Sequence, residues 1–287
     1  MKLGAITDGI SRDYEYALQQ MQRYGLKYPE LQYVWEKEIG DHSEEELERI
    51  RTLTEQYGMT ISVISRQTFM GMQTMATQPD SQSYQAHFQA LLRTMDTARR
   101  LHVKTVRTMT FSKTVNIWGY DGADRWMAGN NQTWSHFLKL YEPIVQAAED
   151  HDIQLVMETG TNAMVCSGYL AKRLITDLQT KHLKVLWDPA NTLCCSDIPF
   201  PEAYEQIRDV LGHVHIKDIV VKPNQATVRA CPIGTGGMGR YLPDIARALR
   251  EDHYDGAISM ELIYRPESGS FEDGYAMQVE KFKELFA

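Results

Sequence analysis

Residues 153–188, IQLVMETGTNAMVCSGYLAKRLITDLQTKHLKVLWD, contain one complete strand–helix–strand unit. The apolar runs 153–158 and 183–188 have the length of buried strands, and residues 167–180 carry the apolar spacing of an amphipathic helix. A strand, a helix and a second buried strand in this order predict two parallel strands joined by a crossover helix. The fold then depends on how often this unit recurs along the chain.

Strand-like and helix-like segments alternate through the whole sequence. The predicted strands cover residues 2–7, 28–34, 60–65, 103–109, 153–158, 183–188, 213–218 and 256–261. The predicted helices cover residues 11–24, 43–57, 81–101, 131–150, 167–180, 200–210, 241–252 and 273–286. This strict alternation predicts an α/β fold, a (β/α)8 TIM barrel, with residues 1–287 as a single domain. An open doubly wound sheet is the alternative, but no G-x-G-x-x-G pattern follows the first strand.

Composition and charge narrow the functional classes. The formal charge of −8 disfavours a nucleic-acid or anionic-membrane partner, because such partners need a basic surface. The amino-terminal stretch MKLGAITDG has no apolar signal-peptide region, and no run of about 18 apolar residues occurs. The four cysteines form no C-x-x-C pair, which favours reduced thiols. We therefore expect a soluble, cytoplasmic protein.

Acidic residues end each of the last four predicted strands. Glu158, Asp188 and Glu261 stand at the carboxyl ends of otherwise apolar runs, and His215 lies close to the end of its own run. One such residue is more often a helix cap or a solvated charge, but four on consecutive strands favour a common site. A nitrogen ligand with three carboxylates suits one divalent metal ion, Mn²⁺, Co²⁺, Mg²⁺ or Zn²⁺.

This ligand set has a definite chemistry when the substrate is a keto sugar. A metal ion acting as a Lewis acid acidifies the C–H bond next to the carbonyl and stabilises the resulting enediolate. Glu158 and Glu261 are then placed to remove one proton and return another. Return to the opposite face gives epimerisation, and return to the neighbouring carbon gives aldose–ketose isomerisation.

Four motifs carry a resemblance to a known family. In order they are VMETG (156–160), WDPAN (187–191), HVHIKD (213–218) and SMEL (259–262). They resemble the xylose isomerase-like TIM-barrel superfamily, and within it sugar-phosphate isomerases and epimerases, D-tagatose 3-epimerase relatives and inosose dehydratases. The resemblance implies Glu158, Asp188, His215 and Glu261 as metal ligands, and Glu158 and Glu261 as the paired acid and base. It also implies a metal-dependent isomerase or epimerase whose small carbohydrate substrate is a keto sugar or a sugar phosphate. Homo-oligomers are common among the relatives.

The sequence departs from the family at three positions. Gly160 and Asn191 stand where many relatives carry histidine, and Val221 stands where ketohexose epimerases carry arginine. These differences weaken an assignment to free-ketohexose epimerases. An inosose-type dehydratase with the same metal site is the alternative function. A metal-dependent apurinic endonuclease is disfavoured, because the chain is acidic and lacks the additional histidine ligands of that class.

Several further residues are candidates for the site. We predict that Lys217, Arg107 and Asn191 bind substrate, although a salt bridge with a neighbouring carboxylate explains Lys217 equally well. His213 shares a strand face with His215 but lies one layer deeper, so we expect a buried, hydrogen-bonded residue. The glycine-rich segment GTGGMGR (234–240) is able to bind phosphate through backbone N–H groups, although this signal alone is weak.

Overall fold

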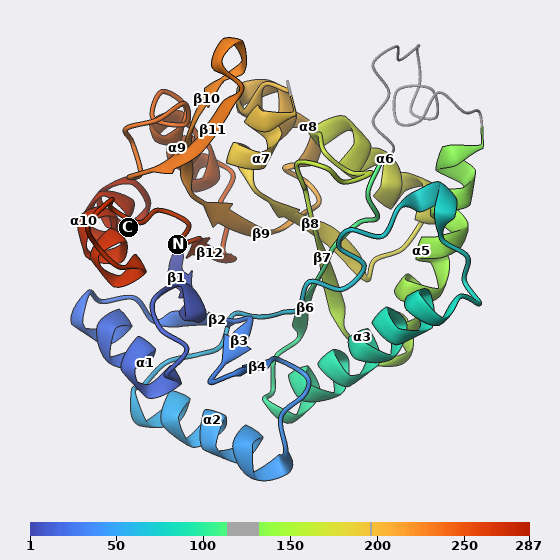
Figure 1. The fold of residues 1–287 in the computed structure, drawn as a ribbon, viewed down its shortest axis with the longest axis horizontal. Coiled ribbons are helices and arrows are strands. Elements are labelled where there is room, and N and C mark those ends of the chain that lie inside the picture. Colours follow the sequence, from blue (N-terminus) through green and yellow to red (C-terminus); the bar gives the residue numbers. More distant parts are fainter. Residues whose placement is uncertain (114–131, 196) are drawn as a thin grey trace.

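The computed structural model describes residues 1–113, 132–195 and 197–287. Its centre is a closed barrel of parallel strands, surrounded by a ring of helices (Figure 1). In chain order the barrel strands are β1 (Lys2–Ile6), β2 (Tyr28–Leu31), β5 (Val63–Ser65), β6 (Thr105–Thr108), β7 (Gln154–Glu158), β8 (Leu183–Trp187), β9 (Leu211–Ile216) and β12 (Ala257–Met260). Pairing of β12 with β1 closes the barrel, which confirms the predicted (β/α)8 TIM barrel.

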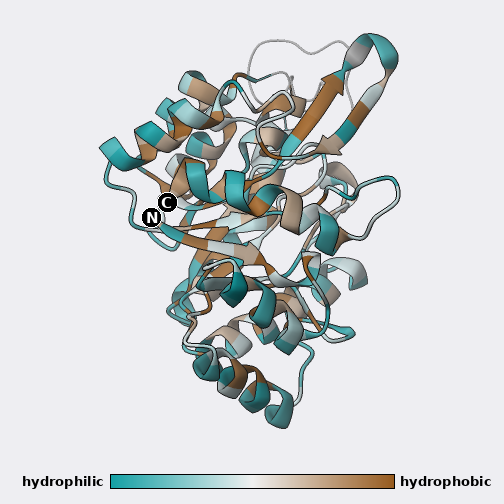
Figure 2. Cartoon of the chain, turned by 90° about the vertical axis from the view of Figure 1, so that its left-hand side faces the viewer, coloured by the Kyte–Doolittle hydropathy of each residue, from teal (hydrophilic) through white to brown (hydrophobic). Residues whose placement is uncertain are grey.

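Each barrel strand is followed by a helix that packs on the outside. These helices are α1 (Tyr14–Arg23), α2 (Glu44–Gln56), α3 (Gln82–Arg100), α5 (Thr133–Asp150), α6 (Gly168–Leu178), α8 (Tyr204–Ile207), α9 (Leu242–Glu251) and α10 (Phe271–Phe286). Figure 2 shows hydrophilic and hydrophobic residues alternating along these helices, as expected when one side faces water and the other faces strands. None of the helices in the described part of the chain is long and apolar enough to cross a membrane.

Two predicted elements differ from the structure. The predicted strand 28–34 is divided, because β3 (Tyr33–Val34) leaves the barrel and pairs with β4 (Lys37–Glu38). The predicted helix 200–210 is reduced to the helical turn η3 (Pro199–Ala203) followed by the short α8. Phe200 has an extended backbone (φ −144°, ψ 135°), because a residue before proline is disfavoured in the helical conformation.

Short elements lie in the segments that follow the carboxyl ends of the strands. They are η1 (Thr7–Gly9), η2 (Thr74–Ala76), α7 (Pro189–Cys194), and the hairpin β10 (Asp218–Lys222) and β11 (Thr227–Cys231) with η4 (Pro223–Gln225) between its strands. The hairpin projects from the rim of the barrel (Figure 1). Between β6 and α5, residues 114–131 lie outside the described residues.

Strand β9 has one residue more than β8 where the two pair, and this β-bulge sets which side chains of β9 face inward. Val185 pairs with Leu211, but the next residue, Leu186, pairs with His213, so Gly212 has no partner on β8. A Cβ atom at Gly212 would approach the Cβ of Lys184 to 2.8 Å, which explains why glycine stands there. An extra residue reverses the alternation of side chains that follow it. The side chains of His213, His215 and Lys217 therefore face the barrel interior.

The glycine-rich segment is folded around a carboxylate of the protein itself. Asp218 accepts hydrogen bonds from the backbone N–H groups of Gly234, Gly236 and Met238, each at 2.9 Å. A Cβ atom at Gly236 would lie 2.5 Å from Asp218 Oδ1, so the close approach requires glycine. Because these three N–H groups already bind Asp218, they are not available to a phosphate, and the prediction that they bind one is wrong.

Substituting Asp218 should destabilise the fold. Asp218→Asn removes the negative charge and places an amide N–H₂ against backbone N–H donors, so at least one buried donor loses its acceptor. We expect a loss of about 2–4 kcal/mol in the free energy of unfolding. Urea denaturation measures this change. Asp244→Asn, in an exposed ion pair with Arg247, is the control and should change stability by under about 0.5 kcal/mol. Equal stability of the two variants would contradict this role of Asp218.

Candidate functional site

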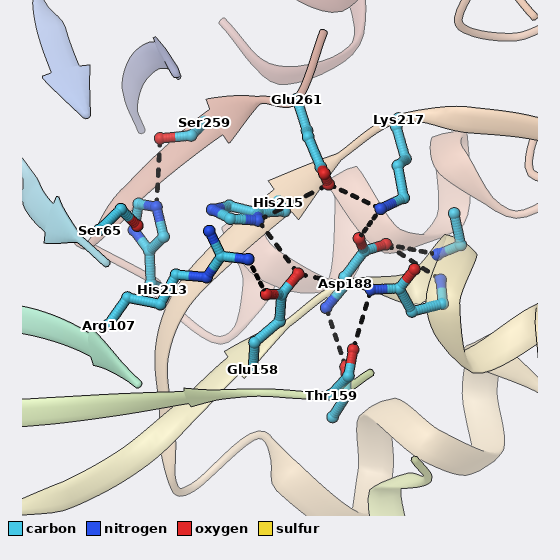
Figure 3. Close-up of polar contacts among 12 residues, drawn as sticks. Ser65, Arg107, Glu158, Thr159, Asp188, His213, His215, Lys217, Ser259 and Glu261 are labelled. Atoms are coloured by element: carbon cyan, nitrogen blue, oxygen red, sulfur yellow. Dashed lines mark hydrogen bonds and ion pairs between the residues drawn. The ribbon is translucent and has the colours of Figure 1, made fainter. Parts of the chain in front are cut away.

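The barrel brings the predicted metal ligands together at the carboxyl ends of its strands. Glu158 ends β7, Asp188 follows β8, His215 lies in β9 and Glu261 follows β12. One potential ligand atom from each residue lies within 4.8 Å of those from the other three. Glu158, Asp188 and His215 are buried, and Glu261 is half-buried. Figure 3 shows their side chains pointing toward one another.

Asp188 is positioned by the helix that begins directly after it. It is the N-cap of α7, and its Oδ1 accepts hydrogen bonds from the N–H groups of Ala190 (2.9 Å) and Asn191 (3.1 Å). Pro189 follows at the first helical position, where a missing N–H has no cost. The cap uses Oδ1, so Oδ2 is left facing the centre of the site. The motif WDPAN thus encodes both the cap and the direction of the carboxylate.

The two ring nitrogens of His215 have different surroundings. Nε2 lies 2.9 Å and 3.1 Å from the two carboxylate oxygens of Glu30. Nδ1 is buried and has no hydrogen-bond partner in the described part of the chain; it lies 3.5 Å from Glu158 Oε1 and 3.8 Å from Glu261 Oε2. Burial lowers the pKa of His215, but Glu30 and Glu158 raise it more, to about 10 without a bound cation. A nitrogen in this position, facing carboxylates, suits a metal ligand.

Two positively charged side chains contact these carboxylates (Figure 3). Arg107, on β6, forms a buried ion pair through Nη2 with Glu158 Oε2. Lys217 Nζ lies 2.6 Å from Asp188 Oδ2 and 2.7 Å from Glu261 Oε2. Burial alone would raise the pKa of Glu158, but Arg107 and the other neighbouring cations lower it to about 2. The salt bridge predicted from the sequence as the alternative role of Lys217 is therefore present.

The charges of the site do not balance. Among the described residues, four carboxylates (Glu30, Glu158, Asp188 and Glu261) face two permanent cations, Arg107 and Lys217. A protonated His215 adds a third positive charge when no cation is bound. With His215 neutral, as a metal ligand must be, two negative charges are in excess. Burial raises the pKa of Asp188 to about 6, and the nearby Glu261 and Glu158 contribute, as expected for a carboxylate with too little positive charge around it. A divalent cation supplies the missing charge, so the donor set and the charge both fit such an ion.

Sequence reasoning missed Glu30. This residue lies in β2 and is fully buried, and it faces His213 and His215 across the barrel interior. Its pKa is held well below the ordinary value because the two histidines outweigh the effect of burial. The only signal in the sequence was an acidic residue in the middle of the strand-like run YPELQYV (28–34). His213 is buried and contacts Glu30 and Ser259, as predicted for a deeper residue.

A cavity of about 310 Å³ opens above this cluster. It is lined by Arg107, Glu158, Asn191, Lys217 and Glu261, so every predicted substrate-binding residue borders it. Amide and hydroxyl side chains complete much of its wall, contributed by Gln67, Thr110, Ser112, Thr161 and Asn162. Met70, Met109 and Ala163 add apolar surface to the wall, so the cavity suits a small ligand with both hydroxyl groups and apolar faces, as a monosaccharide has. A larger depression of about 430 Å³, beside the start of β8, contains none of the candidate residues.

Asn191 connects two parts of the site. Its Nδ2 donates to the carbonyl oxygen of Thr159 at 3.0 Å and lies 3.4 Å from Glu158 Oε1. The side chain therefore fixes the position of Glu158 as well as bordering the cavity. Gly160, where many relatives have histidine, also borders the cavity and adds no side chain to it.

A family profile described as xylose isomerase-like TIM barrel matches residues 18–285. The chain belongs to the xylose isomerase-like TIM-barrel family, which confirms the resemblance seen in the four sequence motifs. No match was found among curated proteins.

Solved structures of the same fold include enzymes of two classes. The IOLI protein with a bound zinc atom has a TM-score of 0.74 at 15% identity, over 99% of this chain and 98% of that one. The probable 3-DHS dehydratase AsbF from Bacillus anthracis has a TM-score of 0.73 at 17% identity, over 99% of both chains. The 3-keto-D-glucoside 4-epimerase YcjR from E. coli has a TM-score of 0.69 at 17% identity, over 98% of this chain and 99% of that one. Identities this low establish a common fold only.

Removing the positive charge beside Glu158 should destabilise the metal-free protein. Arg107→Met leaves a buried carboxylate without its main partner, so we expect a loss of about 3 kcal/mol in the free energy of unfolding. The double variant Arg107→Met, Glu158→Gln should recover part of this loss, because it no longer buries the unpaired charge. Urea denaturation with a chelator present measures both values. Arg93→Met, in an exposed pair with Asp41, is the control. A double variant less stable than Arg107→Met would contradict the role of the pair.

Proposed function

We propose that this protein is a divalent-metal-dependent isomerase or epimerase of a small keto sugar. The observation that carries the proposal is the convergence of Glu158, Asp188, His215 and Glu261. Among the described residues, His215 Nδ1 has no hydrogen-bond partner, and the site has two excess negative charges when His215 is neutral. A bound divalent cation would supply a Lewis acid that polarises the substrate carbonyl. The site opens into a cavity whose volume suits a monosaccharide and whose wall offers both hydrogen-bonding and apolar side chains.

In this proposal the two glutamates divide the proton transfers. Glu158 and Glu261 both border the cavity; Glu261 follows β12, which adjoins β9, and Glu158 ends β7, which is separated from β9 by β8. One removes the proton from the carbon beside the carbonyl, and the other returns a proton to that carbon or to its neighbour. Asn191 and Lys217 border the same space and are able to hydrogen-bond substrate hydroxyl groups. Arg107 keeps Glu158 ionised and in place.

The charges favour a sugar over a sugar phosphate. Both cations that border the cavity, Arg107 and Lys217, already pair with carboxylates within the described part of the chain. The glycine-rich turn, which offers backbone N–H groups, is occupied by Asp218. A phosphate group would therefore have to compete with existing ion pairs. The keto sugar without phosphate is the substrate class that we favour.

A dehydratase of the inosose type is the second candidate. The position of Lys217 favours it, because an ammonium group between Asp188 and Glu261 is able to give a proton to a departing hydroxyl group. Proton removal by a glutamate beside a carbonyl is common to both reactions, so the first step does not distinguish them. The cytoplasmic location, the homo-oligomeric state and the extent of the domain stay predictions from the sequence.

The purified protein should bind one divalent cation per chain. Dialysis against a chelator should abolish turnover, and Mn²⁺ or Co²⁺ should restore it, because the site then regains its missing positive charge. Calorimetric titration of the chelated protein measures the binding. Asp188→Asn should weaken it strongly, whereas Asp209→Asn, in an exposed pair with Lys172, should bind as the wild type does. Chelated protein that takes up no ion would refute the metal site.

Incubation with keto sugars in D₂O tests the reaction itself. We expect deuterium at the carbon beside the carbonyl, detected by NMR, together with an epimer or an aldose as product. Glu158→Gln and Glu261→Gln should each lower the exchange rate by about 10²–10⁴-fold, because each removes one proton-transfer group. Glu284→Gln, exposed on α10, is the matched control. Products that have lost water would favour the dehydratase, and full activity of either glutamine variant would exclude the two-glutamate mechanism.

A further inference from the structure

Glu30 occupies the centre of a buried hydrogen-bond cluster beneath the candidate metal site. Its Oε1 lies 2.9 Å from His215 Nε2 and 2.5 Å from Ser65 Oγ, and its Oε2 lies 2.8 Å from His213 Nε2. His213 Nε2 also lies 3.1 Å from Ser259 Oγ. All of these side chains are at most 1% exposed. The cluster therefore lies in a part of the barrel interior that is closed to solvent. Hydrogen bonds are stronger there than in water, and an unpaired polar group is more costly.

When His215 is neutral, as a metal ligand must be, its contact with Glu30 decides which ring nitrogen carries hydrogen. An ionised carboxylate only accepts hydrogen bonds, so the nitrogen beside it, Nε2, is the donor. The other nitrogen, Nδ1, then presents its lone pair to Glu158 and Glu261. Glu30 achieves this from β2, which is not adjacent to β9 in the barrel order. The contact crosses the interior and cannot arise from strand pairing.

The surroundings of Glu30 hold it in this position. Ser65 comes from β5 on one side, and His213 comes from β9 on the other. The backbone carbonyl of Glu30 also accepts a hydrogen bond from Thr7 Oγ1 at 3.2 Å. With donors on both carboxylate oxygens, the side chain has one well-defined orientation, and this orientation determines the plane of the His215 ring.

We propose that Glu30 is a positioning residue that fixes the tautomer and ring orientation of His215, so that Nδ1 is the atom offered to a divalent cation. This inference rests on the proposed function only in requiring that a cation binds at the four-residue site. Glu30 itself is a poor candidate for contact with substrate, because it is fully buried and does not border the cavity. It acts through His215, as carboxylates hydrogen-bonded to metal-binding histidines do in other sites.

Zinc binding by the chelated protein, measured against a competing chelator, tests the proposal without reference to turnover. Glu30→Ala should bind zinc about 10–100-fold more weakly than the wild type. Glu30→Asp keeps the charge but is shorter by one methylene, so it loses the contact with His215 and should show a similar loss. Val63→Ala is the matched control, because Val63 is the partner of Glu30 in the β2–β5 register and is equally buried. It should lower stability and leave zinc affinity within about 3-fold.

NMR of the zinc-loaded wild type, with ¹⁵N-labelled histidine, gives a second readout that needs no variant. The expected pattern for His215 is zinc on Nδ1 and hydrogen on Nε2, and zinc on Nε2 would overturn the proposal. Unchanged zinc affinity in both Glu30→Ala and Glu30→Asp would overturn it as well. A wild type that binds no zinc, Mn²⁺ or Co²⁺ would overturn the metal site and this inference together. A failure confined to the Glu30 comparison leaves the metal site standing.

Discussion

The structure depends on the burial of like charges at one end of a closed barrel. Carboxylates from β7, β8 and β12 meet within 4.8 Å, in a region from which water is largely excluded. Such a group is unfavourable unless positive charge is supplied. Arg107 and Lys217 supply part of it, and with His215 neutral the deficit that remains among the described residues matches one divalent cation. The same charges that define the candidate site thus also limit the stability of the fold without an ion.

The barrel topology makes this concentration of charge possible. In a closed parallel sheet all strands end at the same rim, so one acidic residue at the end of each of several strands creates a cluster automatically. The orientation of the histidine needs more than this. The extra residue Gly212 in β9 directs His213 and His215 inward, and Glu30 on β2 then holds both rings from across the barrel. The ligand cluster and its support come from opposite sides of the interior.

The motif HVHIKD carries four separate functions in six residues. His213 supports Glu30, His215 faces the three carboxylates, and Lys217 bridges two of them. Asp218 does something different, because it faces away from the site and holds the glycine-rich turn through backbone N–H groups. Alternation of side chains along a strand explains this division: residues 213, 215 and 217 share the inner face, and residue 218 does not.

The sequence by itself determined the repeated strand–helix unit, the barrel that follows from it and the four residues that converge at the rim. These depend on local patterns, since apolar runs and strand-end residues are read from neighbouring positions. Element boundaries around Pro199 and Pro201 were not predicted well, because proline changes the backbone of its neighbours. Only the tertiary structure decided the role of Glu30, the pairing of Arg107 with Glu158 and the occupation of the glycine-rich turn by Asp218. Each of these is a contact between groups far apart in the sequence. Such contacts produce no periodic pattern of residue types along the chain, so they cannot be predicted from neighbouring positions.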